Sequence, residues 1–153
     1  MYGTVILALI AEFILGLVAL EELFWVPSQE DTQASIAAGL VARAAVSATA
    51  WADQNNSFSG AISMGAIPWL DGGQNTGQVG GVVGTVGTSR MVVVWWSGGR
   101  APAGRVSAAL QQQTHCGMCG VTGAGQFATG AGTGMSLPAG VPQGVAAVVS
   151  IGY

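Results

Sequence analysis

The sequence contains no lysine, and its 153 residues include only four arginines, seven acidic residues and one histidine. A phosphate-binding loop of the GxxxxGK[ST] type is excluded because it requires lysine. Four arginines against seven acids leave no basic patch that could neutralise phosphates, so we expect no nucleic-acid partner. Charged residues make up 7% of the chain, and a surface so poor in charge favours contact with other proteins or with a membrane.

The shortage of titratable side chains also limits catalysis and metal binding. His115 has no carboxylate near it in sequence, and the chain offers few acids for a general acid/base pair. One histidine and two cysteines do not complete a structural zinc site. The glycine-rich stretches contain no convincing dinucleotide fingerprint. We therefore expect a protein that is not an enzyme and that holds no catalytic residues, no cofactor and no metal.

The two cysteines, Cys116 and Cys119, form a CxxC motif that directly follows His115. A haem attachment site is excluded because it needs the histidine after the second cysteine. In an oxidising compartment, the pattern favours a local disulfide that pins a loop. Free thiols and a redox or metal-binding pair are the alternatives, although the thioredoxin-like βαβ pattern expected around a redox pair is not visible.

The most prominent feature present is the apolar run from Met1 to Leu20, in which Glu12 is the single ionisable side chain. As a helix, the stretch from Tyr2 to Leu20 is about 28 Å long, close to the thickness of a bilayer's hydrocarbon core. A cleaved signal peptide is disfavoured, because no basic residue precedes the run and no small-x-small site follows it. A buried core helix would need a larger domain around it. We predict a membrane anchor helix over residues 1–26.

Orientation in the membrane is only weakly encoded, because lysine and arginine are missing from both flanks of the run. Acids do crowd its C-terminal side, at Glu21, Glu22, Glu30 and Asp31. We expect the N-terminus in the cytoplasm and residues 27–153 outside it, as one small domain.

Glu12 is costly inside a membrane, by about 2.5–3.5 kcal/mol, unless it finds a partner or is protonated. At helical spacing it shares a face with Ala8, Gly16 and Ala19, and small residues of this kind let two membrane helices approach closely. We predict a helix-packing face made of these four residues, through which the chain could associate with itself or with partner membrane helices. The alternative is a single glutamic acid kept protonated in lipid.

A second, alanine-rich helix is predicted after Pro27, beginning near residues 28–32 with Ser28 as its cap and ending at the turn-forming residues 55–57. We expect its apolar stripe to pack on the sheet of the domain, with a partner-binding face as the alternative. The stripe consists of Ile36, Ala37, Leu40, Val41, Ala44, Ala48 and Trp51.

From Ser59 onward the chain changes character, and this part holds 22 of the 25 glycines. Short apolar runs over residues 78–86, 91–96 and 145–151 predict strands. Residues 104–114 predict a short helix, and residues 123–134 predict a loop. The predicted fold class is α+β: an N-terminal transmembrane helix, then an Ala-rich helix packed on a small Gly-rich β-sheet.

Several segments, taken in order, resemble the small PilM proteins of conjugative thin pili, which are distinct from the actin-like ATPase of the same name. They are MYGTVILALIAEFILGLVAL, LVARAAVSATAWADQNNSFSGAI, IPWL, MVVVWW with a short helix after it, and SLPAGVPQGVAAVVSIG. The most telling is LPAGVPQG, residues 137–144, and the resemblance spans most of the chain.

The resemblance implies a non-enzymatic inner-membrane component of a type IV pilus assembly or pilin-transport apparatus, with its C-terminal domain in the periplasm. Its partners would be pilin and other pilus-assembly membrane proteins. A minor pilin or pilin-like subunit is the alternative, although the sequence lacks a basic leader with a Gly-Phe type junction. A membrane-tethered thiol oxidoreductase built on Cys116 and Cys119 is a third interpretation.

Overall fold

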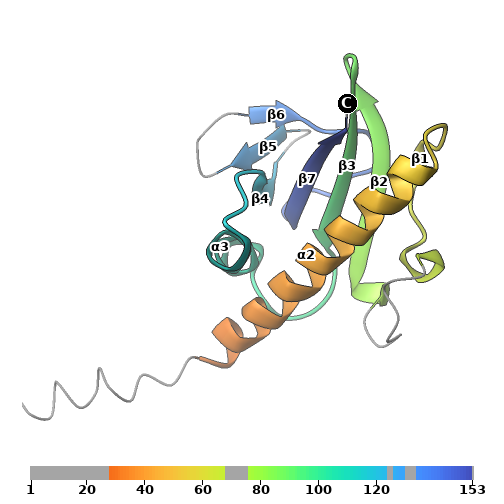
Figure 1. The fold of residues 1–153 in the computed structure, drawn as a ribbon. Coiled ribbons are helices and arrows are strands. Elements are labelled where there is room, and N and C mark those ends of the chain that lie inside the picture. The colour runs from red at the N-terminus through yellow and green to blue at the C-terminus, as the bar shows by residue number, and fades with distance from the viewer. Residues whose placement is uncertain (1–27, 68–75, 124–125, 130–133, 153) are drawn as a thin grey trace, which may run out of the picture.

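The computed structural model describes residues 28–67, 76–123, 126–129 and 134–152. The predicted membrane anchor, residues 1–26, and its packing face of Ala8, Glu12, Gly16 and Ala19 lie outside the described residues. The described chain forms two helices, two 3-10 turns and one sheet (Figure 1). The elements are α2 (Gln29–Gln54), β1 (Gly60–Ala61), η1 (Met64–Ala66), η2 (Thr76–Gln78), β2 (Val79–Val86), β3 (Ser89–Trp96), α3 (Ala103–Thr114), β4 (Cys119–Thr122), β5 (Gln126–Thr129), β6 (Gly134–Ser136) and β7 (Ala146–Gly152).

The long helix α2 begins and ends where local side chains satisfy its free backbone groups. At the start, the Asp31 amide donates a hydrogen bond to the Ser28 hydroxyl at 3.2 Å, so Ser28 is the predicted cap. At the end, the Arg90 guanidinium from β3 donates to the carbonyls of Ala52, Asn55 and Phe58. The last turn contains no basic residue of its own, so Arg90 supplies the positive charge that a helix C-terminus favours.

The sheet is antiparallel throughout, and among the described residues its strand order is β1-β2-β3-β7-β4-β5-β6. The last strand, β7, is therefore inserted between β3 and β4 in the middle of the sheet. On β3, residues 91–95 point to alternate faces of the sheet. Val92 and Val94 point toward α2, and Met91, Val93 and Trp95 point away from it. This alternation follows from the two-residue period of a strand.

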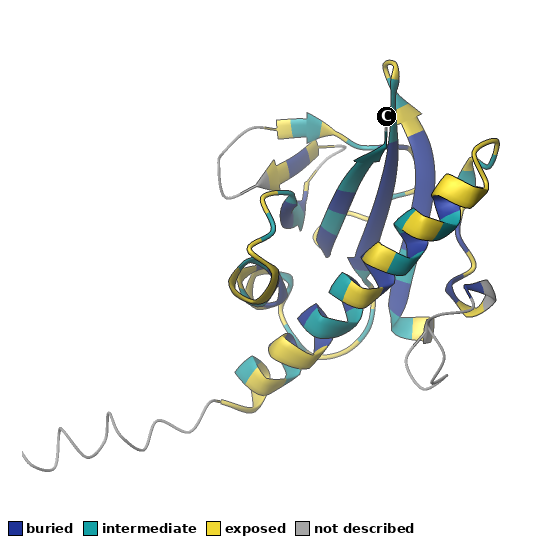
Figure 2. Ribbon diagram, in the orientation of Figure 1, coloured by how far each residue is buried: buried dark blue, intermediate teal, exposed yellow. Residues whose placement is uncertain are grey.

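The helix α2 crosses one face of the sheet diagonally, with α3 beside its N-terminal half (Figure 1). The side of α2 toward the sheet is buried and its outer side is exposed (Figure 2). Its buried residues are Ala34, Ala37, Ala38, Val41, Ala44, Ala45, Ala48 and Ala52. Seven of these eight are alanine, so the helix backbone can lie close to the strands. By length and composition, α2 is the one helix in the described part of the chain that could cross a membrane.

The opposite face of the sheet carries larger side chains, including Trp95 and Phe127, and is covered by the chain between β6 and β7. This covering segment, Leu137–Val145, contains the LPAGVPQG sequence. A Cβ atom at Gly84 on β2 would meet the Pro138 ring, so glycine is needed there for the segment to lie on the sheet. The hydroxyl of buried Thr122 donates to the Pro142 carbonyl at 2.7 Å and accepts from the Val145 amide at 3.1 Å. These bonds fix the end of the segment to β4.

The α+β class is confirmed, as are the positions of the second helix, the short helix and three strands. The loop predicted over residues 123–134 is wrong in part, because β5 occupies residues 126–129 and β6 begins at Gly134. The β5 strand pairs with β4 and buries Phe127 completely. Its formation depends on these neighbours, and four residues are too few to show a strand period on their own.

Candidate interaction groove

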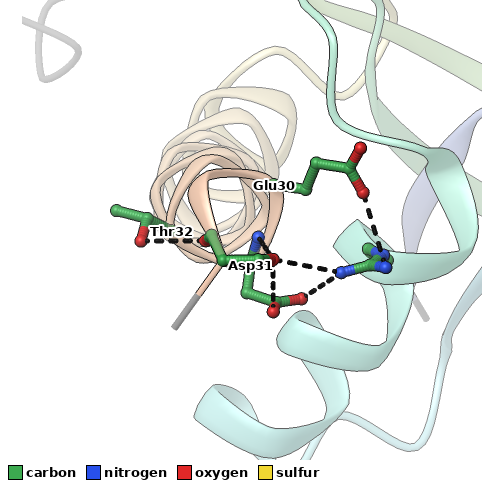
Figure 3. Close-up of polar contacts among 5 residues, drawn as sticks. Glu30, Asp31 and Thr32 are labelled. Carbon is green, nitrogen blue, oxygen red and sulfur yellow. Dashed lines mark hydrogen bonds and ion pairs between the residues drawn. The ribbon is translucent and has the colours of Figure 1, made fainter. Parts of the chain in front are cut away.

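A polar cluster holds the N-terminal end of α2 to α3 (Figure 3). Arg105 of α3 forms ion pairs with Asp31 and, at 3.4 Å, with Glu30. The Ser28 hydroxyl donates to the Asp31 carboxylate at 2.6 Å, and this bond, followed by the bond from Arg105, lowers the pKa of Asp31 below its ordinary value. One turn further along, the Gln113 amide donates to the Ser35 hydroxyl at 2.7 Å. The side of α2 that carries Asp31 and Ser35 is thus covered by α3 near the N-terminal end of α2.

The cover stops where α3 ends, because α3 has 12 residues and α2 has 26. His115 follows α3 in the left-handed conformation, with φ of 48°, and ends the helix there. Cys116 and Cys119 are joined by a disulfide across this turn, with Cα atoms 5.6 Å apart. The Gln111 side chain also donates to the Cys119 carbonyl at 3.2 Å. The turn that ends α3 is therefore held by both a covalent bond and a hydrogen bond.

Beyond this turn an apolar groove of about 570 Å³ opens between α2, the disulfide turn and β7. Val46 stands on its α2 wall with 73% of its surface exposed. Exposed Asp53, in the last turn of α2, lies at the groove and forms no salt bridge within the described residues. The groove is lined by Ala42, Ala45, Val46, Thr49, Ala50 and Asp53 of α2, Thr114 at the end of α3, Cys116 of the disulfide turn, and Val148 and Ser150 of β7.

The residues predicted to pack α2 on the sheet are not all on its buried face. Val41 is fully buried, and Leu40 and Trp51 are partly buried at the edge of the core. The prediction that Ile36 packs on the sheet is wrong, because Ile36 is 58% exposed and lines a separate cleft with Trp96 and Arg100. The prediction is correct for Ala37, Val41, Ala44 and Ala48, which are buried. It did not include four further alanines that the structure buries, namely Ala34, Ala38, Ala45 and Ala52.

In the described residues, no group of three or more His, Cys, Asp or Glu side chains could hold a metal ion. His115 is exposed at the end of α3. Of the cysteines, Cys119 is buried and Cys116 forms part of the groove wall. The groove combines the disulfide turn with α2 residues that the sequence had not singled out, namely Val46 and Asp53. Both fall outside the predicted apolar stripe, and no sequence signal marks them, because single apolar residues are common on protein surfaces.

These observations define a small α+β domain in which one long helix crosses an antiparallel sheet and an apolar groove stays open beside it. The chain belongs to the PilM family, whose family model matches residues 13–150. This confirms the resemblance seen in the sequence and makes the chain a pilus-related protein.

One solved structure, the crystal structure of a PilM protein from Escherichia coli B7A, has a similar fold. The two chains are 16% identical, with a TM-score of 0.56 over 83% of this chain and 98% of the other. At this identity the likeness concerns the fold. No curated protein sequence matches the chain.

Proposed function

We propose that this protein is a non-enzymatic component of the apparatus that assembles a type IV, conjugative thin pilus or that transports its pilin. In this proposal residues 1–26 anchor it in the bacterial inner membrane, and residues 27–153 lie in the periplasm. Its partners are pilin and other pilus-assembly membrane proteins. Membership of the PilM family supports the assignment to a pilus.

The observation that carries the proposal is the apolar groove. Contiguous exposed apolar surfaces mark contacts with other proteins, and here exposed Val46 stands at a groove lined mainly by apolar side chains. The other distinctive side chains already have structural partners: Arg90 and Arg105 hold the ends of α2, and Thr122 holds the covering segment. A role in binding therefore accounts for the surface better than a role in chemistry.

The periplasmic location is supported by the disulfide, because disulfides persist in oxidising compartments such as the bacterial periplasm. Fusing a reporter that is active only in the cytoplasm to the C-terminus of the full chain tests this location. We expect no reporter activity, and we expect the chain to stay in the membrane fraction uncleaved. Reporter activity, or a mature chain that begins beyond Leu20, would contradict the proposed topology.

Complementation tests the function itself. In cells that make the pilus, deletion of this gene should abolish pili while pilin continues to be made, and the wild-type chain should restore them. The Cys116→Ser/Cys119→Ser variant should also restore pili, because the disulfide is proposed to be structural. Pili made at normal numbers without the gene would reject the assembly role, and a folded double variant that restores none would favour the thiol oxidoreductase.

A further inference from the structure

The open flank of α2 has the same chemistry as the flank that α3 already covers. Where α3 lies on α2, the contact is made by small side chains such as Ala34 and Ala109, and an acid in the first turn, Asp31, pairs with Arg105. Further along, the groove again presents small side chains, Ala42 and Ala45 among them, and again an acid, Asp53. The covered part shows what kind of element this flank of α2 accepts.

The dimensions of the open flank also suit a helix. The α2 residues that line the groove run from position 42 to position 53, which is 12 residues, or about 18 Å of helix. The helix α3 also has 12 residues. Alanine, serine and threonine along the walls let a helix backbone come close, and Val46 and Val148 offer apolar contact.

Asp53 indicates the charge of the occupant. An acid in the last turn of a helix is disfavoured by the helix dipole, by about 0.3–1 kcal/mol. The last turn of α2 nevertheless holds Asp53 and no basic residue. Arg90, which reaches this end of α2, donates instead to the carbonyls of Ala52, Asn55 and Phe58. A cation from outside would therefore meet an acid that has no salt bridge in the described part of the chain.

We propose that this groove binds an amphipathic helix of a partner protein, with a lysine or arginine of that helix placed against Asp53. The inference rests on the proposed function and specifies the partner's chemistry. A second copy of this chain is a poorer occupant, because it has no lysine and only four arginines, and Arg90 and Arg105 are already engaged. The net charge of −3 favours approach by a basic surface.

Photo-crosslinking in cells that express the complete pilus gene set tests the proposal. A photoreactive amino acid replaces Val46 in the full-length chain, and mass spectrometry maps the crosslinked residue. The matched control replaces Ile36, which is the other large exposed apolar residue on α2 but lines a different cleft. We expect position 46, and not position 36, to crosslink to an amphipathic helix with a lysine or arginine within two turns of the crosslinked residue.

Charge variants at Asp53 complete the test. Asp53→Asn, which keeps the size of the side chain, should lower the crosslink yield about fivefold, as expected for losing one ion pair. Asp53→Arg should lower it further, and changing the partner's basic residue to glutamate should restore the yield with Asp53→Arg. Because Asp53 is exposed and its charge is disfavoured by the helix dipole, both variants should melt at or slightly above the wild-type temperature, measured by circular dichroism.

Three results would overturn the proposal: a crosslink to a second copy or to a segment without a basic residue, equal crosslinking from positions 36 and 46, or an unchanged yield with Asp53→Arg. These outcomes differ from failure of the proposed function. If the gene is needed for pili but the Asp53 and Val46 variants assemble pili and crosslink no basic helix, the groove proposal fails and the assembly role stands.

Discussion

The two faces of the sheet are covered in opposite ways. Toward α2 the contact is made between alanines of the helix and valines of the strands, such as Val83 and Val94. On the other face the large side chains Trp95 and Phe127 are covered by a segment without regular structure, Leu137–Val145. A helix lies close to a sheet only where side chains are small, whereas an irregular segment can follow the contour of large ones.

This difference explains where glycine is needed. On the face away from α2, Gly80 lies opposite Trp95 in the β2–β3 register, and a Cβ atom there would meet the indole ring. Gly84, four residues further along β2 and on the same face, leaves room for Pro138. Gly80 and Gly84 thus leave room on β2 for the groups that cover this face. On the α2 face the helix supplies the small residues, whereas on the opposite face the strand supplies them.

The largest expected loss of stability comes from removing a large side chain from the face of the sheet that points away from α2. Phe127→Ala removes the largest fully buried side chain of the described residues, and it should lower the free energy of unfolding by about 3–5 kcal/mol. Urea unfolding followed by circular dichroism measures it. A loss below about 1 kcal/mol would mean that this face is loosely packed and that the comparison between the faces is wrong.

A larger side chain between α2 and the sheet tests whether this contact requires small residues. Ala44→Leu places a larger side chain at a fully buried position between helix and sheet, and it should cost about 1–3 kcal/mol of unfolding free energy. The control is Ala108→Leu on the exposed side of α3, which should change stability by less than about 0.5 kcal/mol. Equal effects of the two substitutions would show that α2 does not need its alanines.

Releasing the covering segment should have a somewhat smaller effect. Thr122→Val keeps the shape of the side chain but leaves the Val145 amide and the Pro142 carbonyl without their partner, at a cost of about 1–2 kcal/mol. Thr122→Ser, which keeps the hydroxyl, should recover most of the loss. Hydrogen exchange should then show faster exchange of the Val145 amide in the valine variant alone; unchanged exchange there would mean that the hydroxyl does not anchor the segment.

The smallest effect concerns the pH dependence of the α2–α3 contact. Hydrogen bonds from Ser28 and Arg105 hold the pKa of Asp31 below its ordinary value, so its ionised form stabilises the fold. This contribution is fully present above the unfolded-state pKa, about 3.9, and is lost as the pH falls through the lower folded-state pKa.

Asp31→Asn should therefore flatten the dependence of the melting temperature on pH below about pH 4, with little change in slope above it. Because Asp31 lies at the surface, 0.5 M salt should weaken the effect in the wild type. An identical pH profile for variant and wild type would show that the ion pair with Arg105 contributes nothing in solution.

Local patterns predicted the elements well and their contacts less well. Ser28 was recognised as the cap of α2 because a capping serine depends on residues within one turn of it. Ile36 was assigned to the buried face because apolar periodicity alone cannot say which of two adjacent stripes a sheet will cover. The groove could not be foreseen, since it arises where α3 ends beside a longer α2, and no local pattern records that two helices of unequal length lie side by side.

The sequence by itself determined the α+β class, the two described helices, the three long strands and the family resemblance, because capping, periodicity and glycine content act over a few neighbouring residues. Only the tertiary structure decided the insertion of β7 between β3 and β4, the exposure of Ile36 on α2, and the joining of Val46, Asp53, Cys116 and Val148 in one groove. These depend on contacts between residues up to about a hundred positions apart, whose energies come from packing and burial and are not visible in any short stretch of chain.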